Sequence, residues 1–204
     1  MNLARPPRET PTRDALLDAA HGAIVAGRWP HVRMVDVASE AGVSRQTLYN
    51  EFGTKDALCQ ALALREAGRF LAGTQSAMQR HGGSASEAIG AGVCWGLQVA
   101  ADDPLVKAVL TDDAAGLLPF VTTRAQPVLE AVRDGIAAFL EERWPASAVT
   151  SHAAPTPVTA ATDVADVVVR LTISYLLLPT EPIGASAARV AHVVDRLVHS
   201  RQTG

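Results

Sequence analysis

The chain has few aromatic residues and a large share of small apolar ones. Aromatics make up 4% of the 204 residues, whereas hydrophobic residues make up 48%, so alanine, valine and leucine supply most of the apolar side chains. Side chains of this size let helices pack closely without bulky wedges. No alternating strand pattern persists along the chain. The composition therefore favours an all-α fold.

Cysteines, signal sequences and long apolar runs are scarce as well. Cys59 and Cys94 lie far apart without a CxxC pair, and four charged residues interrupt the first thirteen positions. The apolar run 167–178 contains Arg170 and is too short to cross a bilayer. We therefore expect a cytoplasmic protein with no membrane partner. Both thiols lie on apolar helix faces, where an inert buried thiol is common, although redox sensing remains an alternative.

Motifs for catalysis and metal binding are also missing. The six histidines show no HExxH spacing, and His192 and His199 are seven positions apart, too far to ligate one ion together. No GxSxG, Walker or GxGxxG motif occurs. We expect no enzyme activity, no metal and no cofactor.

Positive charge is concentrated slightly toward the N-terminus. The formal net charge is −3, but residues 1–55 hold seven basic against six acidic side chains, and the remainder holds eleven against fifteen. A phosphate-binding surface is therefore expected in the first quarter of the chain.

Helical spacing of apolar residues predicts the layout of the chain. Residues 1–11, rich in proline and charge, are expected to be a disordered arm, and 145–163 a loop. The first helix is predicted from Thr12 to about Gly27. The other predicted helices span about 34–41, 45–52, 54–80, 84–101, 104–118, 121–144, 160–178 and 185–199.

A glycine separates the two shortest helices. Gly42 can take the left-handed conformation that ends a helix, and Ser44 can cap the next one. Ala38 is small enough to let the second helix pass close, while Val37 and Leu48 supply apolar contacts. This pattern predicts a helix-turn-helix.

The second of these helices begins with polar side chains suited to DNA. Those predicted to be exposed near its start are Arg45, Gln46, Thr47, Tyr49 and Asn50. Arginine and glutamine can bond guanine or adenine edges, and a threonine methyl can contact thymine, so Arg45, Gln46 and Thr47 are candidate base contacts. Tyr49 and Lys55 are candidate phosphate contacts.

The stretch AGVSRQTLYNEFGTKDAL, preceded by TRDALLDAA, resembles the DNA-binding domain of TetR-family transcriptional repressors. The matching motif positions are Ala41, Gly42, Val43, Ser44, Leu48, Tyr49, Phe52, Thr54, Lys55, Asp56 and Leu58. The close match covers roughly residues 12–62, and beyond it only the layout agrees.

The resemblance implies an all-α homodimer that a small molecule switches on double-stranded operator DNA. It implies a helix-turn-helix domain over 12–56 and a ligand-binding and dimerisation domain over 57–204. The expected DNA contacts are Thr12, Arg33, Ser44, Arg45, Gln46, Thr47, Tyr49, Asn50 and Lys55, to which Arg5 and Arg8 of the arm can add.

Two positions depart from the family pattern. Arg33 stands where a serine or threonine usually caps the second helix, so we expect that start to be either looser or capped by backbone and water. Alternatively, Arg33 touches phosphate. Glu51 stands where family members often carry an aromatic residue. A carboxylate facing DNA would repel it, so we expect Glu51 to face solvent or an arginine.

The C-terminal part offers an apolar set of candidate pocket walls. They are Trp95, Leu97, Leu110, Leu117, Leu118, Phe120, Val121, Leu129, Phe139, Leu171 and Tyr175. Taken singly, each is better explained as a core residue than as a pocket wall. Taken together they suit a small apolar ligand, such as a fatty acyl chain or an aromatic compound.

The last two helices carry a broad apolar stripe. It comprises Val164, Val167, Val168, Leu171, Tyr175, Val190, Val193, Val194 and Leu197. Such a stripe is too wide to leave wet on a monomer, and the resemblance places the homodimer interface there. A helical lipid-binding module that does not bind DNA is the alternative interpretation of the whole chain.

Overall fold

The computed structural model describes residues 12–81, 83–111, 119, 122–145 and 160–199, and every regular element in these ranges is a helix. The side chains of 110, 111, 198 and 199 also lie outside the description. The elements are α1 (Thr12–Val25), η1 (Trp29–His31), α2 (Met34–Glu40), α3 (Arg45–Phe52), α4 (Lys55–Arg80), α5 (Ala85–Asp102), α6 (Pro104–Thr111), α8 (Gln126–Arg143), α9 (Ala161–Leu177) and α10 (Ile183–His199).

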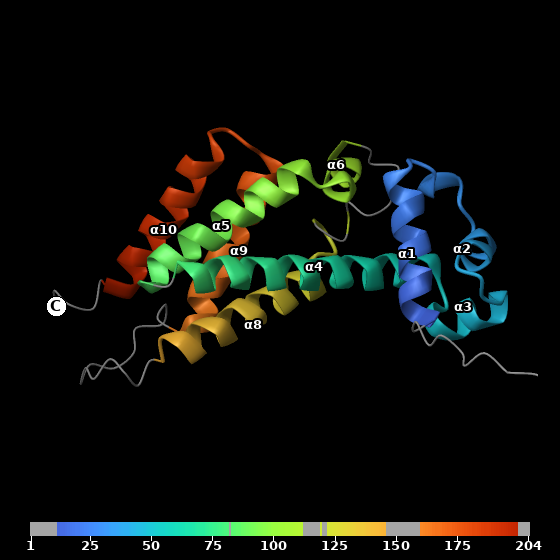
Figure 1. Cartoon of the computed structure of the whole chain (residues 1–204), viewed down its shortest axis with the longest axis horizontal. Coiled ribbons are helices and arrows are strands. Elements are labelled where there is room, and N and C mark those ends of the chain that lie inside the picture. Colours follow the sequence, from blue (N-terminus) through green and yellow to red (C-terminus); the bar gives the residue numbers. More distant parts are fainter. Residues whose placement is uncertain (1–11, 82, 112–118, 120–121, 146–159, 200–204) are drawn as a thin grey trace, which may run out of the picture.

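The molecule is elongated, with the long helix α4 running through it (Figure 1). Helices α1, α2 and α3 gather at one end, and α5, α8, α9 and α10 pack together at the other. The expected all-α architecture, with a small N-terminal unit and a larger helical C-terminal part, is confirmed.

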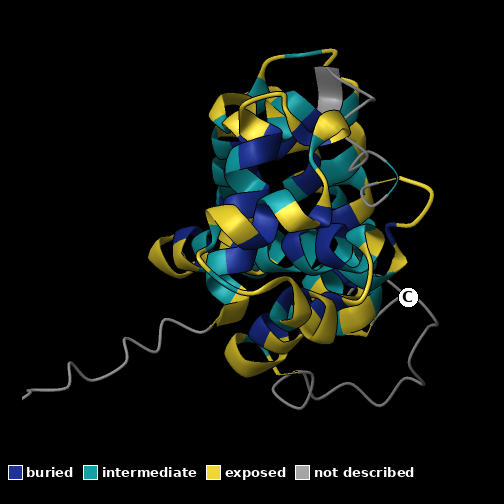
Figure 2. Ribbon diagram, turned by 90° about the vertical axis from the view of Figure 1, so that its right-hand side faces the viewer, coloured by how far each residue is buried: buried dark blue, intermediate teal, exposed yellow. Residues whose placement is uncertain are grey.

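Two apolar cores correspond to these two ends. The N-terminal core contains Ile24 of α1, Val37 of α2 and Leu48 of α3, all at most 1% exposed. The C-terminal core is built from α5, α8, α9 and α10 around side chains such as Ile89 and Val190. In the view of Figure 2, buried residues lie on the inner faces of the helices and exposed residues on the outer faces.

Helix α4 belongs to both cores. Its first turns place Leu58 and Leu62 in the N-terminal core, and its last turns place Met78 in the C-terminal core. Helix α6 also reaches the N-terminal core, through Leu105 and Val109. The two ends are therefore joined by a continuous helix and by a second helix that packs on α1.

A largely buried arginine fastens α4 to α1. The Arg65 side chain is 15% exposed, and its Nη1 donates to Oδ1 of Asp18 at 2.7 Å and to the carbonyl of Asp14 at 3.4 Å. Its Nη2 lies 3.0 Å from Oε1 of Glu66 but is poorly aligned for a hydrogen bond. Because both partners in α1 are one helical turn apart, this contact fixes the rotation of α1 against α4.

The helix boundaries differ from the predicted ones at three places. Residues 29–31 form a short 3-10 helix that apolar spacing did not predict, and Pro30 lies in it. Helix α8 starts at Gln126 rather than at 121, because Pro127 in its first turn is suited to a helix start and needs no N–H partner. Helix α10 starts at Ile183 rather than at 185, with the Pro182 carbonyl accepting the Ala185 N–H.

Other sequence predictions lie partly or wholly outside the described residues. These are the arm 1–11, the end of the predicted helix 104–118 and most of the loop 145–163. The structure within the described ranges shows no helix with the length and hydropathy needed to cross a membrane.

Candidate nucleic-acid interface and ligand region

The predicted turn between α2 and α3 is present. Gly42 has φ of 69°, a left-handed conformation that favours glycine. Just past α2, the Val43 N–H donates to the Ala38 carbonyl at 2.9 Å, which closes the end of that helix. Ser44 Oγ accepts the Thr47 N–H at 3.0 Å and caps α3. The chain therefore changes direction sharply between two short helices.

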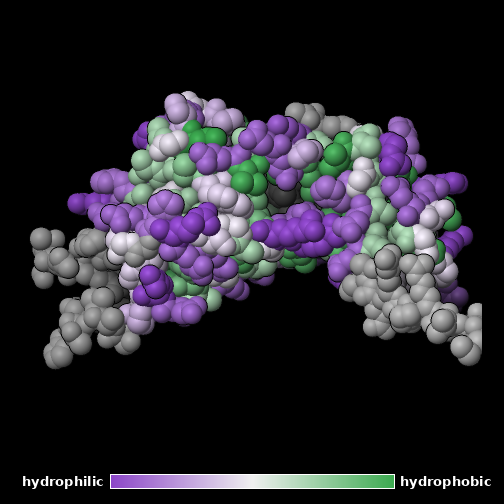
Figure 3. Space-filling view, viewed as in Figure 1, coloured by the Kyte–Doolittle hydropathy of each residue, from purple (hydrophilic) through white to green (hydrophobic). Residues whose placement is uncertain are grey.

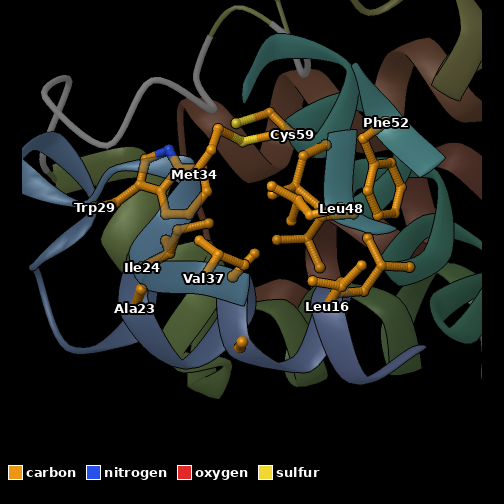
Figure 4. Packing of buried hydrophobic residues seen from close by; sticks show 14 of the residues in the cluster. Leu16, Ala23, Ile24, Trp29, Met34, Val37, Leu48, Phe52 and Cys59 are labelled. Atoms are coloured by element: carbon orange, nitrogen blue, oxygen red, sulfur yellow. The ribbon is translucent and has the colours of Figure 1, made fainter. Parts of the chain in front are cut away.

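Apolar packing fixes the angle between these helices. Val37 is 1% exposed, Ala38 is 2% exposed and Leu48 is fully buried. Figure 4 shows Val37 of α2 and Leu48 of α3 facing the same cluster as Leu16 and Ile24 of α1. The three helices thus share one small core, and the opposite side of α3 is left to solvent.

The exposed side of α3 carries four of the nine predicted DNA contacts. Arg45, Gln46 and Asn50 are exposed, and Tyr49 is 40% exposed. The Arg45 guanidinium lies over the Tyr49 ring, 5.2 Å from its centroid. A cation that already rests on an aromatic ring loses less conformational entropy when it binds a base. The Arg45 side chain is therefore partly ordered before DNA binds.

Thr47 is less free than its neighbours. It is half-buried, and its Oγ1 lies 2.7 Å from Oγ of Ser44, the residue that caps the helix. The two hydroxyls therefore take part in capping α3, which leaves them less able to bind DNA. The Thr47 methyl can still contact a thymine methyl, because that contact needs no hydrogen bond.

Of the predicted phosphate contacts near α1 and α2, Thr12 and Arg33 are exposed. Thr12 is the first residue of α1, and the arm residues Arg5 and Arg8 lie outside the described residues. The Arg33 side chain is 78% exposed, but it contacts the Asp36 carboxylate at 3.3 Å. Any phosphate contact by Arg33 must compete with this carboxylate.

The expectation of a loose start to α2 is wrong. The Asp36 carboxylate, three residues into the helix, accepts the Arg33 backbone N–H at 2.8 Å. This hydrogen bond is one half of a capping box. The other half is missing because it needs an acceptor on the N-cap side chain, and an arginine side chain has none. The hydrogen bonds from Arg33 hold the pKa of Asp36 below its usual range.

Glu51 takes the second of its two expected environments. Its Oε1 accepts from Nη1 of Arg13 at 2.6 Å, and the same guanidinium lies 4.9 Å from the centroid of the Phe52 ring. Arg13 thereby joins α1 to the end of α3. The sequence predicts no role for Arg13, although an acid in a DNA-facing helix suggests that a cationic partner is needed.

Lys55 has partners inside the protein. Its Nζ donates to the Trp29 carbonyl at 2.8 Å and to the Val32 carbonyl at 2.6 Å, and it lies 4.5 Å from the centroid of the Trp29 ring. Sequence reasoning missed Trp29, which is 2% exposed. No periodic signal marks it, because it lies in a short turn.

The predicted pocket walls fall into three groups. Leu97 and Phe139 are buried in the C-terminal core, while Leu129, Leu171 and Tyr175 are half-buried against it. Trp95 is half-buried and packs on Phe70 of α4, with ring centroids 5.5 Å apart. The Leu110 side chain and all of Leu117, Leu118, Phe120 and Val121 lie outside the described residues.

Two surface hollows lie away from these walls. One is lined by residues of α5, α10 and the end of α4, including His81, Glu87 and Cys94. The other is lined by Gln98, Val99, Asp102 and Asp103. Figure 3 shows polar side chains along the middle of α4 and apolar ones where α5 approaches α6.

The apolar stripe on the last two helices is partly used within the chain. Val164, Val168, Val190 and Val194 are at most 6% exposed, because α9 and α10 pack on α5 and on each other. The expectation that the stripe would be left wet on a monomer is therefore wrong for these four valines. The half-buried remainder is Val167, Leu171, Tyr175, Val193 and Leu197.

The two cysteines have different environments. Cys59 is 3% exposed in the N-terminal core, and burial raises the pKa of its thiol to about 11. Such a thiol is unreactive at neutral pH. Cys94 is half-buried and borders the hollow beside α10.

A small bundle that presents the exposed face of a capped helix, fused to a larger helical bundle, defines a helix-turn-helix regulator with a separate C-terminal domain. Residues 16–62 match the family described as bacterial regulatory proteins, tetR family. Residues 85–196 match the bacterial tetracyclin repressor, C-terminal domain.

Individual proteins agree with these matches. The chain is 32% identical over 183 residues to the HTH-type transcriptional regulator AlkX of Mycobacterium tuberculosis, covering 89% of this chain and 82% of that protein. The crystal structure of the TetR-family repressor AlkX from Dietzia sp. strain DQ12-45-1b has a TM-score of 0.72 at 31% identity, over 94% of this chain and 97% of that one.

A more distant structure shares the fold alone. FadR of Thermus thermophilus, in complex with lauroyl-CoA, has a TM-score of 0.60 at 17% identity, covering 90% of this chain and 93% of the other. Together with the matches above, these findings show that the chain belongs to the TetR family. It is a ligand-responsive, DNA-binding transcriptional regulator.

Proposed function

We propose that the protein is a homodimeric repressor that binds a palindromic operator and is released by a small apolar ligand. The observation that carries the proposal is the exposed start of α3, where Arg45 and Gln46 stand clear of the fold on a helix whose other side is buried. Operator binding also places the protein with the chromosome, in the cytoplasm.

In this proposal α3 enters the major groove and its first turn reads base edges. Arg45, Gln46 and Thr47 contact bases, while Thr12, Tyr49 and Asn50 lie nearby for the sugar-phosphate backbone. Two-fold symmetry of the dimer requires two half-sites related by the same axis. Ser44 contributes to DNA binding by capping α3. Arg33 contributes a phosphate contact where a DNA phosphate takes the place of the Asp36 carboxylate beside its guanidinium.

Fluorescence anisotropy with DNA from upstream of the protein's own gene tests the binding. Gln46→Ala is expected to relax sequence preference at one base-pair position in each half-site, at a cost of about 1–3 kcal/mol for the preferred base. Gln79→Ala, at an exposed position of α4, is the matched control. Equal weakening of all operator variants by Gln46→Ala would contradict its role in base reading.

The proposed ligand is apolar because the candidate walls are. Among the described walls, none carries a formal charge, and Tyr175 and Trp95 are the groups that can hydrogen-bond. Two similar proteins support the same class: the Dietzia AlkX is implicated in biodegradation of n-alkanes, and the Thermus FadR binds lauroyl-CoA.

Operator release tests this ligand class. Fatty acids and acyl-CoA esters of increasing chain length are expected to lower operator affinity, with the effect growing as chain length adds buried CH₂ groups. Sugar phosphates of similar size serve as the control. Native mass spectrometry that finds a polar ligand without an acyl chain or aromatic ring on the purified protein would contradict the apolar class.

The proposed dimer uses the part of α9 and α10 that the chain itself leaves half-covered, including Val167, Leu171 and Val193. Sedimentation equilibrium is expected to give a dimer at micromolar concentration. A monomer with full operator affinity would rule out the symmetric interface. A gel shift with the same upstream DNA separates the repressor from the alternative, a helical ligand-binding module without DNA binding.

A further inference from the structure

The Lys55 ammonium makes three contacts within the protein. Two are hydrogen bonds, to the Trp29 carbonyl at 2.8 Å and the Val32 carbonyl at 2.6 Å. The third is with the face of the Trp29 indole, 4.5 Å from its centroid. An ammonium has three N–H bonds, so these contacts leave little donor capacity for a phosphate group.

The two carbonyls lie at the start and just past the end of η1, a single turn of helix. The Trp29 carbonyl also accepts the Val32 N–H at 3.2 Å, so Lys55 is a second donor to it. Lys55 is half-buried and Trp29 is 2% exposed. Figure 4 places Trp29 beside Met34 and Cys59, the latter one turn beyond Lys55 on α4. The cation therefore lies against a fixed surface.

The position of these groups in the chain gives the contact its significance. Val32 immediately precedes Arg33, the N-cap residue of α2, and Lys55 immediately follows Thr54, the N-cap residue of α4. The segment between them, 33–54, is the helix-turn-helix. One hydrogen bond from Lys55 thus joins the two ends of that segment, and the bond to Trp29 anchors both ends to the turn after α1.

We propose that Lys55 is a positioning residue that closes the helix-turn-helix segment 33–54 at its base, rather than a contact to operator phosphate. By holding both ends of the segment together, it fixes where α3 stands relative to α1 and α4. The proposal rests on the operator binding proposed above, but its central claim, that the amine is engaged without DNA, does not.

Lysine labelling of the free protein tests that claim directly. Lys55 and Lys107 are the two lysines of the chain, and the Lys107 side chain is 58% exposed. Brief treatment with an amine-acetylating reagent, followed by mass spectrometry, is expected to modify Lys107 at least tenfold faster than Lys55. Adding operator DNA is expected to change the Lys55 rate little. Equal rates in the free protein, with Lys55 protected only by DNA, would overturn the proposal.

Salt dependence of operator binding tests the positioning role. Lys55→Met keeps the side-chain length and removes the donor, and it is expected to weaken operator binding about tenfold. The slope of log K against log salt concentration is expected to stay unchanged, because no phosphate contact is lost. Arg28→Met, which removes an exposed charge from the same domain, is the matched control.

Two results with the methionine variant would overturn the proposal. One is a slope that flattens by about 0.9 per subunit, which is the signature of a lost phosphate contact. The other is full operator affinity with a lower melting temperature, which would mean that Lys55 stabilises the domain without placing α3. If the wild-type protein binds no DNA at all, the proposed function fails, while the labelling result still stands on its own.

Discussion

The two ends of the molecule hold their helices in different ways. At the N-terminal end the helices are short, with seven residues in α2 and eight in α3, and polar groups bind their ends: Ser44, Asp36 and Lys55 each satisfy backbone groups. At the C-terminal end the helices have 17 or 18 residues and pack along their length. Short helices need caps because few of their backbone groups bond within the helix.

The close packing of the long helices depends on small residues at crossing points. A Cβ on Gly73 of α4 would overlap the ring of Trp95 on α5, and one on Gly135 of α8 would overlap Leu71 of α4. The N-terminal end thus depends on identified polar contacts and one small core, and the C-terminal end depends on shape. A short local motif can therefore mark the N-terminal end, whereas the C-terminal end matches its family over the long stretch 85–196.

Removing a core side chain at the N-terminal end is expected to have the largest effect. Leu48→Ala should lower the free energy of unfolding of that end by about 3 kcal/mol, because Leu48 is fully buried among three helices. Urea unfolding measures the loss, and faster alkylation of the buried Cys59 reports where it occurs. Val35→Ala, at a site 39% exposed, is the control and should change stability by less than about 0.5 kcal/mol.

If the two ends unfold as one unit, this contrast disappears. Hydrogen exchange of Leu48→Ala would then rise equally in α2 and in α9. We expect α1, α2 and α3 to exchange faster while α9 and α10 stay protected.

Filling a crossing point at the C-terminal end is expected to have the next largest effect. Gly73→Val should destabilise the protein by about 2 kcal/mol, because Trp95 must leave its place on α4. Gly68→Ala in the same helix meets no atom within 4 Å and should instead stabilise it by about 0.5–1 kcal/mol. Thermal unfolding of both variants checks the opposite signs, and a stable Gly73→Val would show that the crossing is loosely packed.

Two helix caps with the same chemistry are expected to differ in their effect on function. Thr54 accepts the Ala57 N–H at 3.1 Å to start α4, and Ser84 accepts the Glu87 N–H at 3.2 Å to start α5. Each alanine variant should cost about 1 kcal/mol of stability. Operator affinity should fall only for Thr54→Ala, because Thr54 ends the helix-turn-helix segment. Equal operator affinities of the two variants would remove the distinction.

Acid is expected to give the smallest effect. The pKa of Asp36 lies below its usual value because Arg33 donates to the charged form, so this contact contributes stability above the unfolded pKa, near 3.8. The contribution is lost as pH falls from about 4 through the folded pKa. Asp36→Asn should show a weaker decline in stability over this range. At the C-terminal end, a hydrogen bond from Arg189 lowers the pKa of Glu181 in the turn between α9 and α10. Glu181→Gln is the corresponding variant there.

Local signals predicted most of the fold and part of the site. The Gly42 turn, the Ser44 cap and the Thr54 cap depend on residues within three or four positions, so the sequence alone locates them. The exposure of Arg45, Gln46 and Asn50 followed from the same periodicity. The start of α8 was misplaced because the apolar residues before Pro127 continue the helical pattern.

Contacts between distant positions could not be predicted in this way. The Arg13–Glu51 ion pair joins residues 38 positions apart, and Lys55 reaches 26 positions back to Trp29. Nothing in the local pattern identifies Arg13 as the partner of Glu51, or the two carbonyls as the partners of Lys55. The burial of Val164, Val168, Val190 and Val194 within the chain could not be predicted for a similar reason, since it depends on how α5, α8, α9 and α10 pack together.

The sequence by itself determined that the chain is helical, that a glycine turn separates two short helices, and that the second begins with Arg45 and Gln46. These features follow from backbone conformation and spacing within one or two helical turns. Tertiary structure decided that the Lys55 amine faces two carbonyls and that Arg13 neutralises Glu51. Such pairings depend on where separate helices meet in space, and that meeting is set by the burial of the whole core rather than by any local stretch of sequence.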